Sequence, residues 1–518
     1  MNLVDEPWIP CIWKDGVISR VSLLDCFKFG EDIADLAVRP HERVALMRLL
    51  LCIGYAAAGI PGDYDGWEGL KEKLPSAAVE YLEQWRASFE LFHPDRPFLQ
   101  IAGLSNAKDD GGLTACGKLD VALAAGNNST IWDHAALTDR SFPPEKLALN
   151  LLTYQMFSLG GTIGPVIWNG RKTGRSSCDG PCAPGSMLHT FLRRESLLDT
   201  LHSNMLSEEE LSDYKRLGND WQGRPIWELF PRGLDDSIAV NNATQTFLGR
   251  MVPLTRAVRL SEDGVGMLLG DGLPFPSYTS PKRPFPPEVT ATVVSVGENK
   301  RSLLGVQQGK SIWRQLAALS VMRHGDELGG CAALVHSCEF EDADLVVCGV
   351  ARGQADVVDV VESVFHVPSA MFQAEGHELY EQEVAVAEKV ASGLGIAVER
   401  YRHMVDGGWD LRLQQAGAKK SEVLAALKAI PYRYYWTAVE TGLSLLWDMV
   451  RTCGSNDFLP AKKAWMLHLQ KSANVAYKTA CGTETERQMR AYSKGLRILK
   501  RSLCQCLELQ DNGNKEDS

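Results

Sequence analysis

Two prolines three residues apart impose the strongest local constraint in this chain. They lie in the segment Phe92-His93-Pro94-Asp95-Arg96-Pro97-Phe98-Leu99-Gln100. Proline fixes φ and biases the residue before it toward extended conformations. We therefore expect a rigid corner, with Phe92 and Phe98 anchored in a core and Asp95-Arg96 turned outward. No simple catalytic motif has this form.

Length and composition indicate an ordinary globular protein with several domains. The 518 residues, 45% of them hydrophobic and 23% charged, suffice for two to four domains of roughly 100–200 residues each. The 13 cysteines show no framework spacing, which predicts a reducing cytoplasm. The acidic N-terminus is unlike a signal peptide. The longest apolar run, residues 44–60, contains Arg48 and falls short of the ~20 apolar residues that span a membrane.

Hydrophobic periodicity predicts an α+β fold, in which a large mixed N-terminal domain is followed by a C-terminal four-helix bundle. We expect a hairpin around Asp15-Gly16. The helices expected in the first domain cover residues 42–58, 77–92, 143–157 and 311–322. The helices expected in the bundle cover residues 377–404, 421–453, 460–479 and 484–507. The domains are expected at 1–370 and 371–509, followed by a disordered tail at 510–518.

The last expected helix carries a ridge of positive charge. Thr483 is placed to cap it, with Glu486 reaching back. Five cations recur at helical spacing: Arg487, Arg490, Lys494, Arg497 and Arg501. Apolar residues recur in the same rhythm and predict a seam that faces the bundle: Met489, Tyr492, Leu496, Leu499 and Leu503. A solvated surface would look the same. However, these cations repel one another unless a polyanion lies alongside, which favours a phosphate backbone as partner. The net charge of −11 argues against a protein that binds nucleic acid over its whole surface, but positive charge that is concentrated locally removes this objection.

A glycine-rich stretch follows the helix expected over 143–157. The segment Ser158-Leu159-Gly160-Gly161-Thr162-Ile163-Gly164 opens a loop that also bears Arg171, Lys172 and Arg175. Glycines let backbone amides approach another surface closely, and the cations suggest that this surface is anionic. The pattern is neither a Walker A loop nor a dinucleotide fingerprint. Simple helix termination is the alternative explanation.

A second tip is expected after the apolar strand Leu345–Cys348. The chain turns over Gly349–Gln354, and Ala355–Phe365 has the periodicity of a helix. Its inward positions would be Val357, Val360, Val361 and Val364. A strand–turn–helix corner of this kind projects its tip residues rigidly. An ordinary βα turn without a binding role is the alternative.

These features resemble the large subunit (CasA type) of the type I-E CRISPR surveillance complex, Cascade. Members of that family begin with an N-L-x-x-x-P/N-W-I-P strand, which residues 2–10 match, and carry H-P-x-x-P-F-x-Q near residue 100, which residues 93–100 match. The resemblance covers nearly the whole chain. It implies a subunit that catalyses nothing, needs no cofactor, and recognises the protospacer-adjacent motif (PAM) of double-stranded target DNA through the minor groove. Such a subunit then starts strand separation for guide RNA pairing and helps to recruit a helicase–nuclease.

The resemblance also implies roles for individual positions. Gly160 and Gly161 match a loop that enters the minor groove, and Ser158 stands where relatives can have glycine. Because the minor groove offers a degenerate code, readout there should be permissive. Gln354, with Arg352 and Gly353 beside it, matches a wedge that parts the first base pair, at an unstacking cost of a few kcal/mol.

Further positions follow from the same resemblance. A cation that reaches into the groove corresponds to Lys282 or Arg283. The residues Asn128, Ser129, Thr130 and Trp132 resemble a loop that docks on the Cas5-type subunit and the 5′ handle of the guide, although a buried Trp132 would fit the sequence equally well. The bundle would lie beside the protospacer DNA and the small subunits. The implied partners are therefore the guide RNA-containing Cas5-type, backbone and small subunits.

Two metal sites are not expected. Cys178 and Cys182 are separated by three residues and lack a second pair, which argues against the zinc site that some relatives hold. The acidic run at 339–344 is unaccompanied by a catalytic constellation, which argues against a magnesium-dependent nuclease site. A stand-alone metal-dependent nuclease and a purely architectural bundle protein remain the alternatives.

Overall fold

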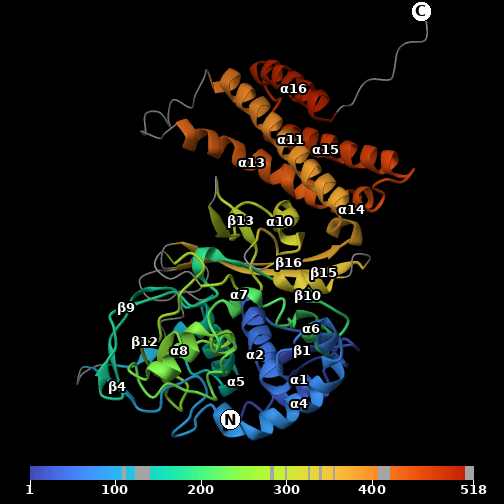
Figure 1. The fold of residues 1–518 in the computed structure, drawn as a ribbon. Coiled ribbons are helices and arrows are strands. Elements are labelled where there is room, and N and C mark those ends of the chain that lie inside the picture. Colours follow the sequence, from blue (N-terminus) through green and yellow to red (C-terminus); the bar gives the residue numbers. More distant parts are fainter. Residues whose placement is uncertain are drawn as a thin grey trace, which may run out of the picture. The chain divides into compact units, whose positions relative to one another are not determined.

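Figure 1 shows a computed structural model of the chain, which describes residues 1–107, 112–122, 140–280, 285–297, 300–324, 327–337, 341–353, 356–406 and 420–507. The chain divides into two compact units. The first comprises Met1–Cys338 and Ala343–His366, and the second comprises Glu339–Asp342 and Val367–Ser518. The first mixes helices with small sheets and the second is helical, so the expected α+β fold class is confirmed. Among the described residues, no helix combines the length and the apolar character that a membrane crossing requires.

The first unit begins with the expected hairpin. Strands β1 (Ile9–Trp13) and β2 (Ile18–Val21) pair antiparallel around Gly16, whose φ of 85° lies in the left-handed region that favours glycine. Strand β3 (Ile33–Leu36) pairs with the other edge of β1. This three-stranded sheet anchors the N-terminal part of the unit.

The first unit also contains a series of helices. They are α1 (Leu23–Lys28), α2 (Pro40–Ala58), α3 (Tyr64–Glu68), α4 (Leu70–Gln84), α5 (Pro144–Phe157), α6 (Leu197–Asn204), α7 (Ser212–Lys215), α8 (Ser237–Gln245), α9 (Phe247–Met251) and α10 (Leu316–Ser320). The predictions of α2 and α5 are confirmed, and α2 is buried along most of its length. The helix expected over 311–322 is shorter, because a 3₁₀ turn at Ile312–Gln315 precedes α10.

The two-proline corner forms largely as expected. The side chain of Phe98 is 1% exposed, whereas Phe92 is only half-buried and the preceding Leu91 takes the core position. Gln100 is buried, donates to the Leu91 carbonyl at 2.7 Å and accepts from the amide of Leu260 at 2.8 Å. The glutamine of the motif therefore ties the corner to the neighbouring sheet.

Five further small sheets complete the first unit as described. They contain β10 (Leu188–Arg193), β15 (Ala343–Gly353) and β16 (Asp356–Val367); β11 (Arg256–Leu260), β12 (Gly266–Asp271) and β5 (Thr114–Ala115); β4 (Leu104–Asn106), β7 (Val166–Trp168) and β8 (Arg171–Lys172); β6 (Gly161–Thr162) and β9 (Ser176–Ser177); and β13 (Val293–Ser295) and β14 (Arg301–Leu303). In the first of these sheets the order is β10-β15-β16.

The helix expected over Ala355–Phe365 is wrong. The described part of this segment belongs to β16, which pairs with β15 to form a hairpin. Five valines between Val357 and Val364 explain the error, since β-branched residues lose side-chain freedom in a helix and fit a pleated surface well. The turn expected over Gly349–Gln354 is also wrong where it is described, because β15 continues through Gly353.

A buried ion triad joins α2 and α9 in the first unit. The Glu288 carboxylate accepts from Arg48 at 2.6 Å and from Arg250 at 2.8 Å. The guanidinium of Arg250 also lies 4.2 Å from the ring centroid of Phe285. Burial alone would raise the pKa of Glu288, but the two guanidinium groups outweigh it and lower this pKa to about 2.

The second unit contains the expected four-helix bundle, with its second helix interrupted. Its helices are α11 (Ala374–Asp406), α13 (Lys420–Glu440), α14 (Leu443–Arg451), α15 (Phe458–Ala480) and α16 (Glu486–Leu507). The helix expected over 421–453 divides at Gly442, where a Cβ would lie 2.3 Å from Nε2 of His468. Glycines also let α11 and α16 approach closely, because a Cβ on Gly393 would lie 2.0 Å from Oγ of Ser502.

Candidate nucleic-acid interface

Ser158 forms the buried base of the glycine-rich loop. Helix α5 ends at Phe157, and the amide of Ser158 still donates to the Tyr154 carbonyl at 2.9 Å. The Ser158 hydroxyl contacts that of Thr255 at 3.2 Å, and its carbonyl accepts from the amide of Gly180 at 2.7 Å. With a side chain that is 1% exposed, Ser158 supports the loop and does not contribute to its surface.

Gly160 and Gly161 carry the loop to the surface. A Cβ on Gly160 would lie 2.8 Å from the Ser177 carbonyl oxygen, so this position requires glycine. Gly161 is exposed and begins β6, which pairs with β9 in the register Gly161↔Ser177. The loop is therefore a short ladder of two strands whose exposed backbone carries little side-chain bulk.

A buried arginine holds the two limbs of this loop together. The guanidinium of Arg256 donates to the carbonyls of Leu159 and Cys178, each at 2.9 Å. Its other terminal nitrogen donates to the Thr255 carbonyl at 2.8 Å. Leu159 and Cys178 directly precede the two residues that meet beside the β6–β9 ladder, Gly160 and Asp179, so Arg256 sets their spacing.

Asp179 joins the glycine-rich loop to the hairpin β15–β16. Its Oδ1 accepts from the Gly160 amide at 2.7 Å, and its Oδ2 forms an ion pair with Arg352, close to the end of β15. The Arg352 amide donates to Oγ of Ser186 at 3.0 Å. Two segments that the sequence only suggested separately therefore meet at one carboxylate. Arg352 is therefore held at the end of β15 by Asp179 and Ser186.

Positive charge flanks the glycine-rich loop on β8 and beyond. Arg171, Lys172 and Arg175 are all exposed. Arg171 forms an ion pair with Asp235 at 3.1 Å. Within the described part of the chain, Lys172 and Arg175 form no ion pair, so both are available to an anionic partner. The turn that orients β8 is Asn169-Gly170, with φ values of 47° and 75°, an Asn-Gly hairpin signal of the type I′ kind.

Helix α16 carries the second group of cations, in the helical unit. Arg487, Arg490, Lys494, Arg497 and Arg501 are all exposed, as expected. Arg490 pairs with Glu486 at 2.5 Å, and Nε of Arg487 donates to the Met404 carbonyl at 3.0 Å. Among the described residues the remaining three form no ion pair, so the ridge is partly unneutralised.

Two details of α16 differ from the sequence prediction. The cap is Thr485, whose hydroxyl accepts from the Gln488 amide at 3.2 Å while Oε1 of Gln488 accepts from the Thr485 amide at 2.9 Å. The predicted cap at Thr483 is wrong by two residues. Met489, expected in the seam, is 57% exposed. The residues that are buried recur every four positions: Ala491, Gly495, Leu499, Leu503 and Leu507.

Comparison with known proteins now decides the family. The family model described as CRISPR-associated protein Cse1 matches residues 2–475. The chain belongs to the Cse1 family. The expectation of a CasA-type large subunit is thereby confirmed.

Individual relatives of this Cse1 family member agree with that assignment. The chain is 28% identical over 505 residues to the CRISPR-associated protein CasA/Cse1 of Thermus thermophilus, covering 92% of this chain and 91% of that protein. Its fold is similar to a crystal structure of Thermus thermophilus CasA, with a TM-score of 0.75 at 23% identity over 98% of this chain and 99% of that one. A chain of a CRISPR RNA-guided surveillance complex gives a TM-score of 0.67 at 17% identity, over 96% of this chain and 99% of that one.

Several predicted site residues of this Cse1 family member lie outside the described residues. They are the wedge residue Gln354, the candidate groove cations Lys282 and Arg283, and the docking-loop residues Asn128, Ser129, Thr130 and Trp132. Gly353, the neighbour of Gln354, ends β15 and is half-buried. The roles of these residues stay predictions.

The described residues offer no support for a metal centre. No group of three or more His, Cys, Asp or Glu side chains among them is arranged to hold a metal ion. Cys178 is exposed whereas Cys182 is buried. Asp344, from the acidic run, hydrogen-bonds to Arg193 and His366. Burial alone would raise the pKa of Asp344, but these two partners lower it overall, as expected of a structural ion pair.

Proposed function

We propose that this member of the Cse1 family is a non-catalytic DNA-recognition subunit of a Cascade complex. In this proposal it finds the PAM of a double-stranded target through the minor groove and starts strand separation for guide RNA pairing. The observation that carries the proposal is the shared carboxylate of Asp179, which fixes the Gly160 loop and the Arg352 turn next to each other. PAM readout and strand opening must act on adjacent base pairs, so the two elements need such proximity.

Gly160 and Gly161 suit a search of the minor groove. Gly160 and Gly161, the first residue of β6, lack side chains, which permits a close approach of the backbone to base edges. A minor groove distinguishes mainly A·T from G·C pairs through the guanine amino group. We therefore propose permissive readout, in which bases are excluded chiefly by steric conflict with that group.

The strand β15, which ends at Gly353, suits the wedge role proposed for Arg352, Gly353 and Gln354. Parting a base step costs a few kcal/mol, so the wedge needs a stiff support. Pairing of β15 with both β10 and β16 supplies one. Arg352 is held by Asp179 and Ser186, which supports a positioning role and leaves insertion to Gln354.

The exposed cations provide contacts to the DNA backbone. We propose that Lys172, Arg175 and, after exchange of its partner Asp235, Arg171 bind phosphates beside the PAM. We propose that Lys494, Arg497 and Arg501, from the bundle domain at 371–509, bind phosphates of the target strands. The Cas5-type, backbone and small subunits with their guide RNA are the proposed partners in the cytoplasm, and a helicase–nuclease follows after strand separation.

The proposal is tested with the assembled, guide-loaded complex. Duplex targets with and without the PAM are compared by mobility shift for the wild-type protein, a Gly160→Asp/Gly161→Asp variant and Gln354→Ala. We expect the glycine variant to lose PAM-dependent binding and Gln354→Ala to bind the PAM but open the duplex slowly. Unchanged target binding by both variants would favour the purely architectural alternative. Cleavage of plasmid by the isolated protein with Mg²⁺ or Mn²⁺ would favour the nuclease alternative.

A further inference from the structure

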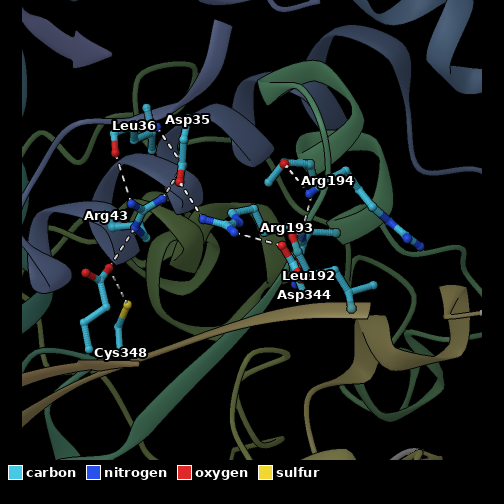
Figure 2. Close-up of polar contacts among 11 residues, drawn as sticks. Asp35, Leu36, Arg43, Leu192, Arg193, Arg194, Asp344 and Cys348 are labelled. Carbon is cyan, nitrogen blue, oxygen red and sulfur yellow. Dashed lines mark hydrogen bonds and ion pairs between the residues drawn. The ribbon is translucent and has the colours of Figure 1, made fainter. Parts of the chain in front are cut away.

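A connected series of ion pairs runs along the hairpin β15–β16. Its members come from five elements: Glu362 and His366 from β16, Asp344 from β15, Arg193 from β10, Asp35 from β3 and Arg43 from α2. We call this set the charge ladder. Figure 2 shows Arg43 and Arg193 on the two sides of Asp35, each within reach of its carboxylate.

Arg43 is the member that ties β16 to the N-terminal elements. Its guanidinium forms an ion pair with Oδ1 of Asp35 and donates to the Leu36 carbonyl at 3.0 Å. Its Nε donates to Oε1 of Glu362 at 3.0 Å. The side chain is only 13% exposed. One arginine therefore ties the middle of β16 to α2 and β3, although the Glu362 side chain is 31% exposed and solvent screens its pair with Arg43 in part.

The other half of the ladder ties the ends of the same two strands. Arg193 donates to Oδ2 of Asp344 at 2.8 Å and lies 3.7 Å from Oδ2 of Asp35. Oδ1 of Asp344 contacts Nδ1 of His366 at 2.8 Å. Thus β15 is linked to β10 through a side-chain ion pair as well as through the backbone, and β16 is linked to β15 through the contact between His366 and Asp344.

The hairpin is consequently held at two levels. Near its tip, Arg352 is bound to Asp179 and Ser186. Away from the tip, Glu362 lies six residues beyond Asp356, the start of β16, which is roughly 20 Å along an extended strand. Because β16 pairs only with β15 among the described strands, the ladder supplies ties that this edge strand otherwise lacks. Attachment at two separated points fixes the direction of the hairpin, whereas attachment at one point would allow it to rotate.

We propose that Arg43 is a positioning residue for strand opening. It ties β16 to α2 and β3, and this keeps the tip of the hairpin from yielding when the wedge presses against the first base pair. The inference rests on the proposed function above. A guanidinium is required because its planar fork engages Asp35, Leu36 and Glu362 together, which a lysine ammonium cannot reproduce.

The test measures PAM binding and strand opening separately in the assembled, guide-loaded complex. The target carries 2-aminopurine at the first protospacer position, so fluorescence reports opening, while mobility shift reports PAM-dependent binding. A second target is already unpaired at its first positions. The variants are Arg43→Ala, Arg43→Lys, Glu362→Gln and the double variant Arg43→Ala/Glu362→Gln. Arg86→Ala, which removes an exposed arginine paired with Asp5 and Glu83, is the matched control.

We expect Arg43→Ala to slow opening about tenfold, which corresponds to about 1.4 kcal/mol, with PAM binding unchanged and normal pairing on the unpaired target. Arg43→Lys should restore opening in part, and the double variant should be no slower than Arg43→Ala. Arg86→Ala should open at the wild-type rate.

Opening at the wild-type rate by both Arg43→Ala and Glu362→Gln would overturn the inference. Should Arg43→Ala fail to fold, as judged by thermal unfolding, Glu362→Gln decides alone. If the wild-type complex ignores the PAM, or Gln354→Ala opens normally, the proposed function fails instead.

Discussion

Gly160 and Arg352 bind the two oxygen atoms of one carboxylate, that of Asp179. Through this contact the glycine-rich loop after α5 and the end of β15 are held next to each other. Arg256 fixes the spacing of the loop from the inside, by donating to the carbonyls that precede Gly160 and Asp179. The proposed roles in PAM readout and strand opening depend on this arrangement.

Asp179→Asn tests the contact directly. The variant keeps an oxygen to accept from the Gly160 amide but removes the charge that faces Arg352. Both side chains of the pair are 25% exposed, so solvent screens it and its contribution to stability should be only about 0.5–1 kcal/mol. Target binding by the assembled complex should weaken more, by about tenfold, as measured by mobility shift. Asp5→Asn, which breaks the exposed pair with Arg86, is the control, and equal effects of the two variants would count against a special role of Asp179.

Gly160→Ala should disrupt the loop. The added Cβ would lie 2.8 Å from the Ser177 carbonyl oxygen, so the β6–β9 ladder must shift, at a cost of about 1–3 kcal/mol. We expect a lower thermal unfolding temperature and a loss of PAM-dependent binding. Gly164→Ala is the matched control in the same loop, since a Cβ there meets nothing within 4 Å. If both variants behave alike, close packing at Gly160 does not matter.

The sequence allowed much of the fold to be predicted where local signals and burial agree. The Asp15-Gly16 turn, α2, α5 and the helical bundle have strong periodicity or turn chemistry, and all formed. The helix predicted over Ala355–Phe365 was wrong because valines at helical spacing are also compatible with a strand, and pairing with β15 favours the strand. The buried seam of α16 recurs every four residues, with the small Ala491 and Gly495 followed by three leucines, so Met489 falls outside it although it is large and apolar.

The candidate site was predictable only in part. Gly160 and Arg352 stand out in the sequence, but their meeting point does not, because it depends on tertiary contacts between distant segments. In the sequence, Asp179 stands out only as the neighbour of Cys178, whose spacing from Cys182 and lack of a second cysteine pair argue against a zinc site. Arg256 looks like any strand residue until its buried guanidinium is placed. The Asn169-Gly170 dipeptide is a local signal that could have predicted the turn before β8.

Glu288 should make the stability of the protein sensitive to acid. Its folded-state pKa of about 2 lies below the ordinary value of 4.5, so the ion triad stabilises fully above pH 4.5 and loses its contribution as the pH falls toward 2. The contribution is on the order of 3 kcal/mol. Glu288→Gln should therefore destabilise strongly at pH 6, and the difference from the wild type should shrink by pH 3. Urea unfolding at both pH values measures this, with a constant difference as the contradicting result. Glu42, whose pKa also lies at about 2, is retained in both proteins.

The ridge on α16 should be visible in the salt dependence of target binding. Removal of one phosphate contact reduces the slope of log K against log salt concentration by about 0.9. We expect Lys494→Ala/Arg497→Ala/Arg501→Ala to remove two to three such contacts and so to reduce the slope by about 2–3. A control variant with the same change in net charge replaces the exposed Lys14, Lys28 and Lys73 by alanine. An equal reduction in the control would mean that net charge, and not the ridge, governs binding.

Photocrosslinking tests most directly whether the loop and the hairpin enter the DNA together. A benzophenone side chain is placed at Thr162 in β6 or at Val358 in β16, both exposed, with Val17 in the N-terminal hairpin as control. The guide-loaded complex is then irradiated on a duplex target. We expect crosslinks from Thr162 and Val358 to base pairs at the boundary between the PAM and the protospacer, and none from Val17. Crosslinks from Thr162 and Val358 to separate, distant parts of the target, or none from either, would contradict this expectation.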